Sequence, residues 1–170
     1  MKTIIFEGEL NNENVQELVD ELQQPYIEEP EDDIVLYFSS KGGYDHSAEI
    51  IIDCINSLPE ERKVKIVFYF AVYSAAFNMF IRCKCKKVVK WGAIGLVHLV
   101  TRDVGVREAI NDNESFDKFL LDNTNDVNEE YLKWIEGLDC FTPKELKELS
   151  KGRDVFLNSK KLKKILKNQK

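Results

Sequence analysis

Runs of consecutive apolar residues alternate along the chain with segments in which apolar residues recur every three or four positions. The runs are rich in β-branched and aromatic residues and predict buried strands, at residues 34–38, 64–70 and 87–91. The periodic segments between them predict amphipathic helices, at residues 11–24, 46–58 and 74–83. Regular alternation of strand and helix indicates a mostly parallel sheet with crossover helices. The pattern therefore predicts one α/β domain over residues 1–170.

Between residues 101 and 128 the sequence becomes polar and acidic, and a clearer helix is predicted at residues 127–137. The strong apolar residues of the polar segment form one cluster, Phe116, Phe119, Leu120 and Leu121. Two interpretations stay open: a helix that docks on a neighbouring subunit, or a solvated helix on its own domain. In the first, Phe116, Phe119 and Leu120 lie at a subunit contact.

The remaining segments are short. Residues 25–33 are acidic and predict a linker, and residues 155–157 predict a short strand. Residues 158–170 form a basic tail whose lysines surround three apolar residues, Leu162, Ile165 and Leu166. We expect a terminal helix docked by these apolar residues rather than a membrane-binding segment.

Composition narrows the functional classes. The net charge of -6 argues against nucleic acid as a partner, because phosphate binding needs a clustered positive surface. No apolar stretch is long enough to span a membrane, and Glu7 and Glu9 stand where a signal peptide needs an apolar core. We therefore expect a cytoplasmic protein that binds neither nucleic acid nor membrane.

The four cysteines have no spacing typical of a disulfide framework, and we expect them to be reduced. Cys83 and Cys85 form a C-x-C pair without another close pair of ligands, which argues against a zinc site. We expect no metal and no cofactor. Cys140 is expected to be the most reactive cysteine, because it adjoins a candidate site residue, Asp139.

Ser74 is a candidate nucleophile because it is predicted where a strand turns into a helix. The first amides of a helix have no partner within it, and they can stabilise an oxyanion formed beside the serine. His98 follows a later strand and is the candidate base. The alternative interpretation is a helix N-cap serine and a histidine with purely structural hydrogen bonds.

Two other segments carry further candidates. Gly42 and Gly43 lie between a predicted strand and a predicted helix, where paired glycines let the backbone approach a substrate and turn an amide towards it. Asp139 precedes the helix expected after Pro143. In a parallel sheet the site lies at the carboxyl ends of the strands, where Gly43, Ser74 and His98 are all predicted.

Taken in this order, the segments resemble the proteolytic subunit of the Clp protease and its relatives in the crotonase-like superfamily. The resemblance begins at TIIFEGEL, residues 3–10, and continues through LYFSSKGG, residues 36–43, where the family has a strand ending in Ser-Pro-Gly-Gly. Ser74, His98 and Asp139 fall on the family's nucleophile, histidine and aspartate. The match extends to about Leu157, and it implies the ClpP/crotonase-like α/β fold.

The resemblance implies a serine endopeptidase. Ser74 would be the nucleophile, His98 its base, and Asp139 the carboxylate that orients the imidazole. His46 is the rival base and Asp103 the weaker candidate for the orienting acid.

The resemblance also implies a substrate site and an assembly. The backbone amides of Gly43 and Ala75 would form the oxyanion hole, and Gly42 and Tyr73 would contact the substrate. The substrate would be an unfolded or partly unfolded polypeptide, cut inside a ring of identical subunits that an ATPase unfoldase partner could feed. A handle shorter than the family's is expected within residues 101–137.

Departures from the family pattern keep two alternatives open. Lys41 replaces the proline before the glycines, and Phe70, Val72 and Tyr73 replace small residues before the serine, where they crowd the substrate's place. The chain could therefore be an assembly or regulatory subunit with little turnover. It could also be a crotonase-type enzyme that acts on an acyl thioester, which needs the fold and an oxyanion hole but no triad.

Overall fold

The structure is a computed structural model that describes residues 1–28, 33–59, 61–99 and 114–169, with the backbone alone for residues 25–28 and 114–123. It divides into two compact units. The first contains Met1–Val97 and Phe156–Lys170, and the second contains His98–Val155.

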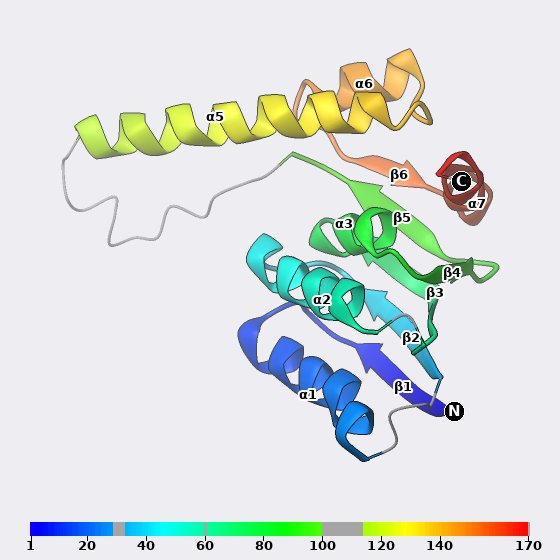
Figure 1. Cartoon of the computed structure of the whole chain (residues 1–170). Coiled ribbons are helices and arrows are strands. Elements are labelled where there is room, and N and C mark those ends of the chain that lie inside the picture. The colour runs from blue at the N-terminus through cyan, green and yellow to red at the C-terminus, as the bar shows by residue number, and fades with distance from the viewer. Residues whose placement is uncertain (29–32, 60, 100–113, 170) are drawn as a thin grey trace. The chain divides into compact units, whose positions relative to one another are not determined.

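A six-stranded sheet organises the fold (Figure 1). Its strands are β1 (Lys2–Glu7), β2 (Ile34–Ser40), β3 (Val64–Tyr73), β4 (Lys86–Val89), β5 (Ile94–Val97) and β6 (Val155–Leu157). The order is β1-β2-β3-β5-β6, and β4 also pairs with β3. The four pairings among β1 to β5 are all parallel, so these strands end at the same edge. The predicted α/β fold with a mostly parallel sheet is confirmed.

Helices cover the sheet of the first unit. They are α1 (Asn12–Glu28), α2 (Asp45–Ser57), α3 (Ala75–Arg82) and α7 (Ser159–Asn168). Figure 1 shows α1, α2 and α3 side by side over one face of the sheet, and α1 contacts α2, which contacts α3. α7 packs against β4 and β5 and buries Leu162 and Ile165, as the sequence predicts for the tail.

Aromatic side chains form the centre of the core. Phe6 stacks on Phe38, with ring centroids 5.1 Å apart. Phe38 meets Phe68 edge to face, and Phe68 meets Phe80 of α3 in the same way. Full burial of one such ring stabilises a fold by about 1.5–3 kcal/mol. This row of rings joins three strands to the helix that follows Ser74.

Helix α1 is longer than the sequence predicts. It continues through Pro25 to Glu28, so the expected linker does not begin at residue 25. A proline in a helix lacks the N–H that would bond the carbonyl four residues earlier, which here belongs to Glu21. The ammonium of Lys2 donates to that carbonyl at 3.1 Å and replaces the missing bond.

Strand β5 was not predicted as a separate strand, because Gly92 and Gly95 interrupt its apolar pattern. Gly95 allows close packing: a Cβ there would lie 2.9 Å from a methyl carbon of Leu162 and 3.2 Å from the Cβ of Leu157, so both side chains would have to shift. The absent side chain lets β6 and α7 approach the sheet closely. The residue that obscures the strand in the sequence is the one that its neighbours need.

The second unit contains α5 (Glu114–Gly137) and α6 (Pro143–Leu149). Residues 114–137 form one continuous helix, α5, whereas the sequence predicts a separate helix that begins only at residue 127. Of the polar segment 101–128, for which two interpretations stay open, residues 114–128 belong to α5. The side chains of Phe116, Phe119, Leu120 and Leu121 lie outside the described residues, so their place at a subunit contact stays a prediction. The single-domain description and the shorter handle also stay predictions.

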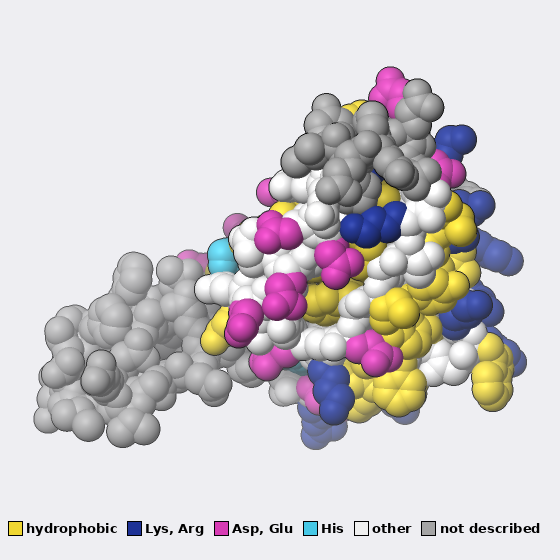
Figure 2. Space-filling model, turned by 90° about the horizontal axis from the view of Figure 1, so that it is seen from below, with side chains coloured by type: hydrophobic (Ala, Val, Ile, Leu, Met, Phe, Trp, Pro, Cys, Tyr) yellow, Lys and Arg dark blue, Asp and Glu magenta, His cyan; other side chains and the backbone are white. Residues whose placement is uncertain are grey.

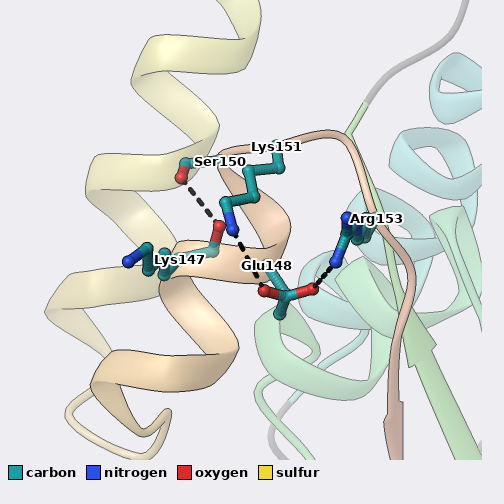
Figure 3. Close-up of polar contacts among 5 residues, drawn as sticks. All are labelled: Lys147, Glu148, Ser150, Lys151 and Arg153. Atoms are coloured by element: carbon teal, nitrogen blue, oxygen red, sulfur yellow. Dashed lines mark hydrogen bonds and ion pairs between the residues drawn. The ribbon is translucent and has the colours of Figure 1, made fainter.

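Helix α6 is fixed at both ends by local hydrogen bonds. Thr142 and Glu145 form a reciprocal capping box at its start. At its end Glu148 binds Arg153 at 2.6 Å and Lys151 at 3.5 Å, as Figure 3 shows. The pKa of the Glu148 carboxyl is lowered, chiefly by its hydrogen bond to Arg153. These bonds define the segment that follows Asp139.

Candidate active site

Ser74 lies at the junction of β3 and α3 in a backbone conformation that glycine normally adopts. Its φ is 54° and its ψ is -126°. These are close to the angles of the first central position of a type II′ turn, which glycine dominates because a Cβ is crowded there. The Ser74 amide donates to the Leu96 carbonyl of β5 at 2.9 Å, while the side chain makes no capping bond to α3. The N-cap interpretation requires the hydroxyl to accept a hydrogen bond from the first turn of α3, and the hydroxyl makes no such bond.

Gly42 brings the loop after β2 against Ser74. A Cβ at Gly42 would lie 2.7 Å from the Ser74 Cβ and 2.7 Å from the Tyr73 carbonyl oxygen. Its φ of 95° also favours glycine. Both sterics and backbone conformation therefore require glycine here. Gly42 and the half-buried side chain of Tyr73 flank the serine, and both residues are predicted to contact substrate.

Two backbone amides near this junction are candidates for an oxyanion hole. Gly43 pairs with Leu10 in a parallel bridge, which uses the carbonyl of Gly42 and the amide of Tyr44 and leaves the Gly43 amide outside it. Ala75 is the first residue of α3, so its amide has no partner four residues earlier in the helix. Both amides belong to the first unit, as Ser74 does. Their role as an oxyanion hole stays a prediction.

A bulge in β3 shapes the approach to these glycines. The register of β2 and β3 shifts between the pairs Phe38–Phe68 and Ser40–Val72. Two buried serines hold the shifted backbone: the Ser39 hydroxyl accepts from the Ala71 amide at 3.1 Å, and the Ser40 hydroxyl accepts from the Gly42 amide at 3.0 Å. Phe70 lies in the bulge and is 71% exposed.

A pocket of about 610 Å³ opens where β1 and β2 end and β3 bulges. Its walls come from the loop after β1, the two serines of β2, the Lys41–Gly42–Gly43 loop, Phe70 and Ala71. Next to it, the Tyr69 hydroxyl donates to Glu7 at 2.5 Å. Desolvation, followed by the Glu7 carboxylate, raises the pKa of Tyr69 to about 12. The pocket meets Ser74 through Gly42, which contacts both.

His98 belongs to the second unit and is half-buried. Its Nδ1 lies 2.6 Å from the Leu99 carbonyl oxygen. A carbonyl only accepts, so Nδ1 carries the hydrogen and the neutral ring keeps its acceptor at Nε2. That tautomer is the one a base for serine needs. Among the described residues the predicted bond from His98 to Asp139 is absent, because the Leu99 carbonyl occupies Nδ1.

Asp139 follows α5 and is exposed. Its φ is 48°, and its amide donates to the Glu136 carbonyl at 3.1 Å. Aspartate tolerates this left-handed conformation better than most residues. Ser74 and Asp139 are the two non-glycine residues with positive φ in the described parts of the chain. Both had been selected from the sequence as site residues.

The rival candidates have other environments. His46 is exposed in α2, with Nε2 3.3 Å from the Asn12 side-chain oxygen. Asp103 lies outside the described residues. Cys140 is buried, and none of the four cysteines, all of which lie within the described residues, forms a disulfide. Burial raises the pKa of Cys83, and it raises the pKa of Cys85 to about 11.

Sequence reasoning missed Ser39 and Ser40, which shape the pocket, and it missed that Phe70 forms part of the pocket wall. The available signal was the pair of serines that ends an apolar strand, since buried hydroxyls in a core strand need hydrogen-bond partners.

In the described ranges, no group of three or more His, Cys, Asp and Glu side chains is arranged to hold a metal ion. The helices of those same ranges include none long and apolar enough to cross a membrane.

Comparison with solved structures finds a similar fold in a point mutant of ClpP1 from Listeria monocytogenes. The TM-score is 0.67 at 19% sequence identity, over 96% of this chain and 86% of that chain. No protein-family model and no curated protein matches this sequence. Since one fold hosts many functions, a likeness at this identity establishes architecture and not activity. The chain therefore has a ClpP-like fold.

Proposed function

We propose that this protein is a serine endopeptidase of the Clp type, with Ser74 as its nucleophile. One observation carries the proposal: Ser74 occupies a glycine-type conformation at a strand-to-helix turn while its hydroxyl makes no capping bond. Non-glycine residues in such conformations cluster at active sites, where surrounding structure holds them. A serine kept there for packing alone would be replaced by glycine at no structural loss.

The proposed reaction is ordinary acyl transfer. His98 takes the Ser74 proton at Nε2 as the serine oxygen attacks the peptide carbonyl, and the amides of Gly43 and Ala75 bind the oxyanion. The C–N bond breaks when the imidazolium returns that proton to the leaving amine. Water then hydrolyses the acyl-enzyme by the same steps. Asp139 is proposed to orient and stabilise the imidazolium.

The polypeptide is proposed to enter along the pocket beside the glycines. Gly42 and Tyr73 flank the serine, and the exposed Phe70 offers an apolar contact at the pocket wall. The ClpP-like fold supports assembly into a ring of identical subunits, which encloses the site. An ATPase that unfolds substrates would be the partner of such a ring. Sedimentation that shows a monomer at micromolar concentration would contradict the chamber.

Covalent labelling with a serine-reactive phosphonate tests the nucleophile. We expect modification at Ser74, lost in Ser74→Ala and retained in Ser150→Ala, an exposed serine at the end of α6. The Ser74→Ala variant should keep its circular dichroism and its oligomeric mass. A wild-type protein that never labels, together with an unfolded Ser74→Ala variant, would show that the serine is structural.

Variants of the base and the acid test the rest of the triad. His98→Ala should suppress labelling, whereas His46→Ala should leave most of it. Asp139→Asn keeps a residue that tolerates positive φ and removes only the charge, so the cap of α5 is preserved. We expect its labelling rate to fall by about three to four orders of magnitude. An unchanged rate would instead assign the orienting role to the Leu99 carbonyl.

A second candidate is a ClpP-like assembly subunit without efficient turnover. The observation that favours it is the His98 bond to the Leu99 carbonyl, which occupies the nitrogen that a triad aspartate would bind. It predicts a stable oligomer in which Ser74 does not label. In many enzymes the catalytic hydrogen bonds are long before substrate binds and shorten in the complex. The absence of a His98–Asp139 bond without substrate is therefore compatible with a peptidase.

A further inference from the structure

Among the described residues, Arg62 is a buried cation without a hydrogen-bond partner. The residue is 4% exposed, and none of its three guanidinium nitrogens has a hydrogen-bond partner in the described part of the chain. The turn before β3 holds its backbone, since the Arg62 amide donates to the Pro59 carbonyl at 2.9 Å. Buried charges in proteins are normally paired, because an unpaired one strongly opposes folding. The orphaned guanidinium therefore points to a missing anion.

Arg62 lines a pocket of about 610 Å³ at the edge where the strands begin. This edge is opposite the one that carries Gly42 and Gly43, so the pocket is separate from the candidate active site. Four lysines share its lining, Lys63, Lys65, Lys84 and Lys86. Asp33 is the one acidic residue among the lining residues that the structure describes. In Figure 2 many Lys and Arg side chains gather along the right edge, the side on which β1 to β5 begin in Figure 1.

The lining also specifies the chemistry of the ligand. The guanidinium carries its donors as a planar fork, which matches carboxylate and phosphate groups. All three of its nitrogens are buried, so a ligand meets them only once the Arg62 side chain turns towards the pocket. Apolar side chains, including Ile34, Ile55 and Leu58, complete the wall. The lysines raise the local positive potential and draw anions towards the pocket. A simple structural role would pair Arg62 with the last carbonyls of α2 beside Leu58, and no such bond forms.

We propose that this pocket binds a small organic anion, a carboxylate or phosphate group on a short apolar body, with Arg62 as the central ligand-binding residue. The site is independent of peptidase chemistry and goes beyond it. Binding neutralises the guanidinium and stabilises the turn between α2 and β3. Arg62 would select ligands by their negative charge and by a match to the guanidinium fork, and the apolar wall would select them by size.

Calorimetry with two probes tests the proposal, namely inorganic phosphate and hexanoate, each against chloride at equal ionic strength. We expect at least one probe to bind the wild-type protein. Hydrogen bonds to charged groups account for about tenfold to hundredfold in affinity, so Arg62→Met should weaken binding by that factor. Lys90→Met, which removes an exposed cation outside the pocket, should leave it unchanged. Phosphate binding alone would identify a phosphate ligand, and hexanoate binding alone a carboxylate.

Thermal melts of the unliganded variants provide an independent measurement. Arg62→Met should melt at the same temperature as the wild type or higher, because it removes an unpaired buried charge. A large fall in melting temperature would overturn the proposal by assigning Arg62 a structural role. The exposed pair Lys84→Glu and Lys86→Glu leaves Arg62 in place and should also abolish binding in a folded protein. Failure of both probes to bind the wild type would equally refute the site.

Discussion

Replacing Ser74 by glycine should stabilise the protein while it removes the proposed nucleophile. A non-glycine residue held in this part of φ/ψ space costs about 1–3 kcal/mol. Glycine relieves that strain but loses about 0.4–1 kcal/mol through the greater freedom of the unfolded chain. The hydroxyl makes no capping bond whose loss would add to the balance. The net expectation is a gain of about 1 kcal/mol in the free energy of unfolding.

Ser74→Ala separates the strain from the hydroxyl. Alanine keeps the Cβ and therefore the strain, so its stability should lie within about 0.5 kcal/mol of the wild type. The informative quantity is the difference between the glycine and alanine variants. For a chain of this size, 1 kcal/mol corresponds to about 2–4 °C in melting temperature. Urea unfolding and thermal melts, followed by circular dichroism, resolve such a difference.

Ser150 provides the matched control, since it has helical angles, φ -63° and ψ -16°. There glycine should be less stable than alanine by about 0.5–1 kcal/mol. The sign of the glycine-minus-alanine difference should therefore reverse between positions 74 and 150. If glycine is the less stable variant at both positions, the Ser74 backbone is not strained. The conformation of Ser74 would then give no support to a catalytic role.

Two further predictions concern local contacts. Gly42→Ala should displace Ser74, destabilise the fold by about 1–3 kcal/mol and abolish phosphonate labelling, whereas Gly137→Ala, with open space around its Cα, should do neither. Arg153→Gln should lower the melting temperature at neutral pH and lose this effect in acid. Because Arg153 lowers the folded pKa of Glu148 from 4.5, its stabilisation is present above that value and is lost as pH falls through the folded pKa. A difference that persists at pH 2 would refute the ion pair as its cause.

The strand and helix pattern was predictable because burial in a parallel sheet leaves long apolar runs. β2 has six buried residues of its seven, and its strand signal survives without any tertiary information. α1 was predicted too short, since Pro25 looks like a terminator when read locally. Its extension depends on Lys2, which is far away in the sequence and supplies the bond that proline cannot.

The pocket beside Gly42 and Gly43 could not be predicted, because it also depends on contacts between residues far apart in the sequence. At the bulge that contains Phe70, the Ser39 hydroxyl accepts from the Ala71 amide, and that contact joins residues 32 positions apart. A sequence shows the serine but not the strand it will face. Likewise, it shows that His98 follows a strand, but not that the Leu99 carbonyl takes the Nδ1 hydrogen.

Ser74 was predictable as a candidate from its place between a strand and a helix, and Asp139 from its match to the family's aspartate. In the structure, each of them departs from what local structure prefers. A turn with the angles of Ser74 favours glycine, and the left-handed residue after α5 favours glycine or asparagine. Asp139 also places a negative charge next to the carboxyl end of a helix, where the helix dipole disfavours it. Natural sequences follow local preferences except where function overrides them. Two such exceptions, at Ser74 and Asp139, coincide with two positions of the proposed triad. Selection for the proposed chemistry would account for this coincidence, because neither residue is the one that stability alone would choose.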